Sequence, residues 1–234
     1  MKSIPSMSLK TKAMKSLGRK ILCVLLSGVF FGDTIAWAEA PILPDTKAPG
    51  NRYPLVQETA NGIPLVNISA PTAGGVSRND YERFNIPTKG AILNNSYTLS
   101  KTELAGYVQG NANMAQGPAK IIVNQVTSGN PTTMNGFLEV AGHKADVIIA
   151  NPNGITVNGG GFINTARAIL TTGKPEYDSK ERLKDFRIDN DATILITGNG
   201  LNGKKQTHWN FIPEPQKSKR LSLGIPYMSP PVPM

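Results

Sequence analysis

Beyond about residue 90 the chain consists of short apolar segments, rich in β-branched side chains, separated by Gly, Asn, Pro and Ser. β-Branched residues favour strands, and Gly and Asn tolerate the positive φ angles of sharp turns. No stretch after residue 40 keeps apolar residues at helical spacing for three turns, which argues against a helical domain. We therefore expect an all-β protein, with strands in segments 65–68, 91–93, 120–123, 136–140, 145–150, 154–157, 166–171 and 192–197.

This strand pattern fits a sandwich, a barrel or a parallel β-helix. The dense Asn and Gly at the turns favour the β-helix, because stacked coils can align Asn side chains into hydrogen-bonded ladders. The run Val147-Ile148-Ile149 does not alternate, which predicts a strand with one face toward the helix interior and the other under a cap. Residues 41–87, rich in Pro, Gly and Asn, are expected to act as a lead-in or cap.

The first residues read as an export signal. Residues 1–20 are polar and basic, and residues 21–32 form an apolar run of signal-peptide length that is short for a membrane span. Ala36 and Ala38 satisfy the small-x-small cleavage rule, whereas a cut two residues later would place Pro41 beside the scissile bond. We predict a signal peptide over 1–38, with a retained membrane anchor as the alternative.

The formal net charge of +9 raises the question of a nucleic-acid partner. Six basic residues lie in 1–38, and three more lie in the segment 206–234. The body between them carries no cluster of Lys and Arg of the kind that phosphate binding requires. We therefore expect no nucleic-acid binding.

Residues suited to catalysis or metal binding are sparse. The one cysteine, Cys23, lies in the predicted leader, and the only histidines are His143 and His208, so neither a disulfide, a zinc site nor a catalytic triad is expected. Acidic residues between 178 and 191 alternate with basic ones, which favours a solvated loop over the paired carboxylates of a glycosidase. We expect no cofactor and no enzymatic activity. The acidic residues in question are Asp178, Glu181, Asp185, Asp189 and Asp191.

One block carries a family resemblance. Residues 120–173 contain Asn151-Pro152-Asn153-Gly154-Ile155, preceded by the strand-like segment 145–150 and followed by Phe162-Ile163-Asn164. The block resembles the two-partner-secretion (TPS) domain of filamentous haemagglutinin, haemolysin and contact-dependent inhibition exoproteins, and N-P-N-G-I is a signature of that family. The similarity reaches back to residues 75–79 and forward to about Leu201.

The resemblance implies a right-handed parallel β-helix with an amino-terminal cap over residues 39–205. It also implies export to the periplasm, recognition there by the periplasmic domains of a dedicated outer-membrane transporter, and delivery to the cell surface or beyond. The passenger that such a domain precedes would be an adhesin, a haemolysin or a contact-dependent toxin, with a host or neighbouring-cell surface as a further partner.

Two turns are the candidate recognition elements. Asn151 to Ile155 either only closes a coil or also helps to present the docking surface, where an exposed strand edge would pair with the transporter by strand addition. The family's upstream N-P-N-L motif is replaced here by Asn111-Ala112-Asn113-Met114. Loss of the Pro removes a fixed φ angle and should reduce the rigidity of this turn. The cysteine pair of some relatives is absent, with Val157 and Gly160 at its positions.

The segment 206–234 contains six Pro residues and no β-helix periodicity. We expect either a disordered terminus or a disrupted reading frame, since a shifted frame permits residues similar to the family's continuation. Two other functions remain open: a stand-alone secreted adhesin, for which Tyr97 and Tyr107 are the candidate contacts, and an extracellular carbohydrate-active enzyme on a β-helix.

Overall fold

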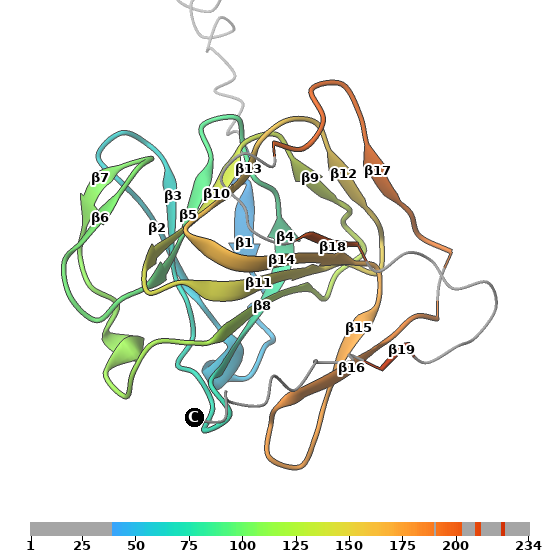
Figure 1. Cartoon of the computed structure of the whole chain (residues 1–234), viewed down its shortest axis with the longest axis horizontal. Helices are drawn as coiled ribbons and strands as arrows, with labels where there is room; N and C mark the ends of the chain where they lie inside the picture. The colour runs from blue at the N-terminus through green and yellow to red at the C-terminus, as the bar shows by residue number, and fades with distance from the viewer. Residues whose placement is uncertain (1–38, 190, 203–208, 212–220, 223–234) are drawn as a thin grey trace, which may run out of the picture. The chain divides into compact units, whose positions relative to one another are not determined.

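A computed structural model describes residues 39–189, 191–202, 209–211 and 221–222 of the chain (Figure 1). The described chain is almost entirely strand, with two 3-10 turns, η1 (Gly50–Arg52) and η2 (Ala112–Met114). Among the described residues, no helix has the length and apolarity needed to cross a membrane. The predicted leader, with Ala36 and Ala38, lies outside the described residues.

Three sheets make up the body of the described chain. The first has six strands: β1 (Ile42–Pro44), β4 (Val76–Phe84), β8 (Ile121–Val126), β11 (Ala145–Ala150), β14 (Thr165–Thr171) and β18 (Trp209–Phe211). The second has five strands: β13 (Gly161–Ile163), β10 (Phe137–Gly142), β5 (Ala91–Asn95), β3 (Pro64–Asn67) and β2 (Leu55–Glu58). The third has three strands: β17 (Ile194–Ile196), β12 (Ile155–Val157) and β9 (Thr132–Met134).

The chain visits these sheets in rotation. It passes from β8 to β9 to β10, then from β11 to β12 to β13, and each strand pairs in parallel with its counterpart in the next coil. Successive coils are therefore stacked rungs of a β-helix, which confirms the predicted fold class. The right-handed winding and the amino-terminal cap stay predictions. The only antiparallel pairs within these three sheets of the described chain are β1 with β4 and β2 with β3, at the amino-terminal end of the stack.

The interior of the β-helix is apolar and closely packed. Ile122, Val147 and Ala168 lie side by side on three neighbouring strands and point inward together with the buried Tyr81 and Phe84. Burial of such side chains supplies most of the free energy that holds the coils together.

The expected asparagine ladder is present at the outer end of the five-stranded sheet. Asn94 lies opposite Asn67 in the parallel register and donates a 2.8 Å hydrogen bond to its Oδ1. Asn67 in turn donates to Oε1 of Gln57 at 3.1 Å. Amide side chains on neighbouring strands thus donate to one another in series, although Oδ1 of Asn94 is buried without a hydrogen-bond partner in the described structure.

Two hairpins outside the coils cover outer sheet faces (Figure 1). The hairpin of β6 (Ser100–Thr102) and β7 (Gly106–Val108) places Val108 against Ile92 of the five-stranded sheet. The hairpin of β15 (Lys174–Tyr177) and β16 (Leu183–Arg187) lies on the six-stranded sheet, and β19 (Leu221–Ser222) pairs with its outer edge.

The second hairpin corrects one expectation and confirms another. The mixed-charge stretch from 178 to 191 is not simply a solvated loop, because residues 183–187 form a strand in which Phe186 is buried. Phe186 packs this strand against the sheet. Because its neighbours in the sequence are charged, the pattern did not predict a strand here. As expected, Val147-Ile148-Ile149 is buried on both faces, with Ile148 outward and covered by this hairpin.

The segment 206–234 contributes two short strands within the described residues. β18 continues the six-stranded sheet in parallel with β14, and β19 pairs with β16. The domain boundary at residue 205 and the disrupted frame stay predictions.

Candidate functional site

The turn from Asn151 to Ile155 connects β11 to β12. The side chain of Asn151 is fully buried, and its Nδ2 donates to the carbonyl of Asn130 and to Oγ1 of Thr132, both at 2.9 Å. Its Oδ1 accepts from the backbone N–H of Asn153 at 2.9 Å, which forms an Asx turn. The carboxamide therefore fixes the local turn and binds it to the preceding coil.

The backbone of the same turn binds the following coil. The N–H of Asn151 donates to the carbonyl of Thr171 at 2.9 Å, and the N–H of Ile155 donates to the carbonyl of Thr193 at 3.1 Å. Gly154 adopts a φ of +102°, where a Cβ would stand 3.2 Å from the Thr193 carbonyl. The positive φ strongly favours glycine here, and a side chain would also crowd the Thr193 carbonyl.

The outer part of the turn faces solvent. Asn153 is exposed and Pro152 is half-buried, although Nδ2 of Asn153 still donates to the carbonyl of Ser128 at 2.6 Å. The signature thus divides into a buried structural residue, Asn151, and an accessible surface formed by Pro152 and Asn153. The structural interpretation of Asn151 is sufficient to explain its contacts.

The second candidate turn, at Asn111, forms despite the missing proline. Oδ1 of Asn111 accepts from the N–H of Asn113 at 3.1 Å, and its Nδ2 donates to the carbonyls of Ile68 at 2.9 Å and Asn94 at 3.0 Å. Met114 then anchors the turn in the apolar interior. The turn forms without the proline that the family motif carries, because hydrogen bonds of the Asn111 side chain and the packing of Met114 stabilise it.

A charged cluster on β4 was missed by the sequence analysis. Asp80 is buried, and its carboxylate lies 3.4 Å from Nε of Arg52. Burial raises the pKa of Asp80 above 3.8, although Arg52 and Arg78 oppose the shift. The guanidinium of Arg78 lies 3.8 Å from the ring centroid of Tyr177, whose pKa burial raises to about 12. Tyr177 is therefore a neutral phenol, and the contact is a cation–π interaction.

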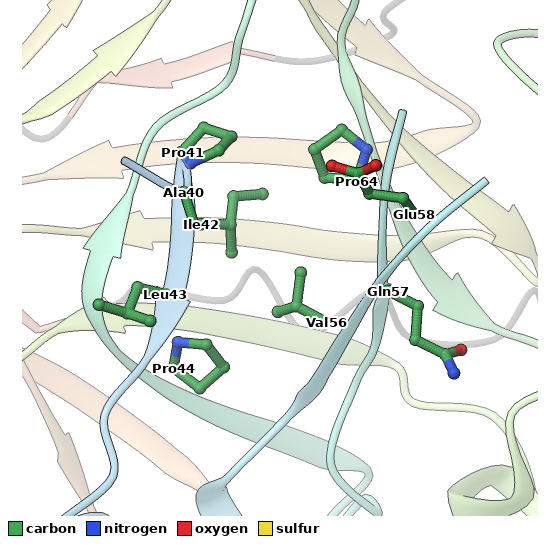
Figure 2. Close-up of a pocket in the computed structure, with 9 residues that line it drawn as sticks. All are labelled: Ala40, Pro41, Ile42, Leu43, Pro44, Val56, Gln57, Glu58 and Pro64. Carbon is green, nitrogen blue, oxygen red and sulfur yellow. The ribbon is translucent and has the colours of Figure 1, made fainter. Parts of the chain in front are cut away.

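A shallow groove of about 320 Å³ lies between β1 and β2 (Figure 2). Ile42 and Val56 project into the space between the two strands, and Pro44 and Pro64 add to its apolar walls. Both strands are outermost in their sheets. The groove offers an apolar surface and strand edges, with one carboxylate, Glu58, among its lining residues.

Three of the carboxylates considered for catalysis, those of Asp178, Glu181 and Asp189, lie in ion pairs. Asp178 forms an ion pair with Arg182 at 2.7 Å, and Glu181 lies 3.8 Å from Arg78. Hydrogen bonds from Arg182 hold the pKa of Asp178 below its usual range. In the described part of the chain, no group of three or more His, Cys, Asp or Glu residues could hold a metal ion.

Comparison with known proteins now identifies the domain. The family model described as "TPS secretion domain" matches residues 40–223, which is most of the chain. The chain belongs to the TPS secretion domain family.

Relatives and a solved structure agree with this assignment. The chain is similar to "Toxin CdiA" of Yersinia pestis, with 44% identity over 188 residues, covering 80% of this chain and 6% of that protein. It is 43% identical over 166 residues to "tRNA nuclease CdiA-2" of Burkholderia pseudomallei, covering 70% of this chain and 5% of the relative. The solved secretion domain of filamentous hemagglutinin matches with a TM-score of 0.64 and 33% identity, covering 74% of this chain and 55% of that one.

These matches confirm the predicted family and the general role of a TPS domain. TPS exoproteins are secreted through the periplasm to the cell surface or the surroundings, and the partner in this route is an outer-membrane transporter. The chain spans about 6% of the length of the curated relatives. Recognition roles for the turns at Asn111 and Asn151 stay predictions.

Proposed function

We propose that this TPS domain is the part of a two-partner-secretion exoprotein that the transporter's periplasmic domains recognise. The observation that carries the proposal is the division of the signature turn. Asn151 is buried and ties three coils together, whereas Asn153 of the same turn is exposed. The buried contacts of Asn151 account for the structural corner, whereas Asn153 is exposed and accessible to a partner although its Nδ2 donates to the carbonyl of Ser128.

Strand addition to the transporter requires an unpaired edge, and β2 supplies the more suitable one. β1 contains Pro44 and follows Pro41, and proline has no N–H to donate to an added strand. β2 runs from Leu55 to Glu58 without proline, and Leu55 is 53% exposed. A partner strand paired with this edge would also face the apolar groove between β1 and β2.

The recognition role includes no catalysis. Glu176, Asp178 and Glu181 of the β15–β16 hairpin form ion pairs, and Asp189 lies within 4 Å of both Lys174 and Arg187. The relatives are called a toxin, tRNA nucleases and a 16S rRNA endonuclease, which suggests a toxin as the passenger of this domain.

Exposed aromatic residues favour a second candidate function. Tyr97, which precedes β6, and Tyr107, which lies on β7, are 61% and 69% exposed, as a direct adhesin contact would require. Binding of the purified domain to cell surfaces, abolished by Tyr107→Ser, would support adhesion as a role of the domain itself.

The test of the main proposal is secretion by cells with and without the transporter, measured together with folding. Asn153→Ala and Leu55→Lys change accessible positions, and lysine on an edge strand opposes strand addition. We expect both variants to fold normally and to accumulate in the periplasm. Asn151→Ala serves as the control for misfolding. Normal secretion of both surface variants would remove these positions from the docking surface, and secretion without the transporter would contradict the proposal itself.

A further inference from the structure

The β15–β16 hairpin covers the six-stranded sheet from β14 back to β4. One outward-facing row on that sheet consists of Arg78 on β4, Val123 on β8, Ile148 on β11 and Ile169 on β14. The last three pack in one cluster with Phe186 of the hairpin, and Tyr177 and Leu183 pack at its margin. The hairpin leaves the coils after β14 and therefore extends back over three earlier coils.

The far end of the hairpin is fastened to the first coil. The ring of Tyr177 covers the guanidinium of Arg78, and Oε1 of Glu181 lies 3.8 Å from the same guanidinium. Oγ1 of Thr72 donates to the carbonyl of Glu181 at 3.4 Å. A Cβ at Gly74 would stand 2.7 Å from Cγ of Arg182, which shows how closely the hairpin turn approaches this loop.

The turn of the hairpin is rigid in its own right. Oδ1 of Asp178 accepts from the backbone N–H groups of Lys180 and Arg182 at 2.9 and 3.0 Å. Glu181 adopts a φ of +56°, an uncommon conformation for a residue with a side chain. The turn thus presents Glu181 to Arg78 and Thr72 in a fixed geometry.

The hairpin is joined to the coils by different contacts from those that join the coils to one another. Coils share continuous ladders of backbone hydrogen bonds, whereas β15, β16 and β19 form a sheet that has no strand in common with the six-stranded sheet. In the described part of the chain, the hairpin and the sheet meet through side-chain packing, the Arg78 contacts and a hydrogen bond from Thr72, with no strand ladder between them. Such a unit can separate without breaking a ladder, and units of this kind open at lower free energy than the core.

We infer that the β15–β16 hairpin is a clasp that fastens the coil of β14 to the coil of β4 through Arg78 and opens as one unit while the coils beneath stay folded. In the closed state, Val123, Ile148 and Ile169 are covered. In the open state, the same row faces solvent beside a free arginine. Closure requires both β4 and β14, so the clasp completes only when every coil between these two strands is in place.

The test is native-state hydrogen–deuterium exchange on the full chain, read separately for residues 174–187 and for β11. In the unchanged protein we expect residues 174–187 to exchange faster than β11. Tyr177→Ala and Arg78→Ala should each accelerate exchange of the hairpin about fivefold, with no change in β11. The double variant should accelerate exchange by less than the product of the two single effects, because both remove the shared contact between Arg78 and Tyr177.

Two further variants keep the test decisive. Arg78→Lys retains the charge and loses the planar group that stacks on Tyr177, so it should accelerate hairpin exchange without affecting the coils. Lys184→Ala, at an exposed position of β16, should leave exchange unchanged. Equal exchange rates for the hairpin and β11 in the unchanged protein, or equal acceleration of both by Arg78→Lys, would overturn the inference.

Discussion

Asn111 and Asn151 form the same hydrogen-bonded turn at two different corners of the β-helix. Each Oδ1 accepts from the backbone N–H two residues later, at 3.1 Å for Asn111 and 2.9 Å for Asn151. Each backbone carbonyl also accepts from the N–H three residues later, from Met114 at 3.0 Å and from Gly154 at 3.1 Å. The proline that distinguishes the two motifs is therefore not needed to form the turn.

Replacing Asn151 should destabilise the domain far more than replacing Asn153. Asn151→Ala removes two hydrogen bonds to the preceding coil, one of them to the buried Oγ1 of Thr132 and the other to the carbonyl of the half-buried Asn130. We expect a loss of about 2–4 kcal/mol in the free energy of unfolding. Asn153→Ala, at an exposed position, should cost about 1 kcal/mol or less. Urea unfolding of both variants measures the difference, and equal costs would contradict the structural role of Asn151.

Restoring the family's proline should stabilise the upstream turn. Ala112 is exposed and is the first residue of η2, where proline is well tolerated, and the preceding Asn111 is already extended at φ −95° and ψ 114°. Ala112→Pro should raise the free energy of unfolding by about 0.4–1 kcal/mol, because it restricts the unfolded chain. A shift of the urea midpoint to lower concentration would show that the turn differs from the described one.

The outward face of β11 should behave as core. Ile148 is 1% exposed beneath the hairpin, so Ile148→Ala should cost about 2–4 kcal/mol, as expected for an interior isoleucine. Ile196→Ala on β17 is the matched control, since Ile196 is 49% exposed and should cost about 1 kcal/mol or less. Similar urea midpoints for the two variants would mean that the hairpin does not cover Ile148 in solution.

Asp80 should give the domain a distinctive pH dependence. Because burial raises the pKa of Asp80 above 3.8, the folded protein holds this proton more tightly than the unfolded chain. The stabilisation that the protonated Asp80 gives to the folded state is therefore fully present below pH 3.8. It is lost as the pH rises through the pKa of Asp80 in the folded protein. Compared with Asp80→Asn, the unchanged protein should lose stability over that range and then level off. Urea unfolding at a series of pH values measures this, and the opposite slope would mean that Arg52 outweighs burial.

The strands with continuous apolar residues could be predicted from the sequence. The segment 145–150 was expected as a strand and is β11 with the same bounds. The strand β4 was missed because its sequence, VSRNDYERF, has few apolar residues. Its inward polar groups are satisfied by partners distant in sequence, such as Asn124, whose Oδ1 accepts from the Tyr81 hydroxyl at 3.1 Å.

The two turns could be located by resemblance, but the resemblance did not show which of their residues are buried and which are exposed. Their sequences contain alternating Asn residues, and nothing in that pattern indicates that Asn151 is buried while Asn153 is exposed. The partners of Asn151 are contributed by two other coils, at residues 130–132 and 171. The contact between Arg78 and Tyr177 could not be predicted from the sequence either, because it joins the first coil to a hairpin about a hundred residues later.

The most direct test of the central claim is a binding titration between the folded domain and the isolated periplasmic domains of its outer-membrane transporter. We predict saturable binding by the unchanged domain and at least tenfold weaker binding by a folded Asn153→Ala or Leu55→Lys variant, equivalent to about 1.4 kcal/mol. Absence of binding by the unchanged, folded domain would contradict the account.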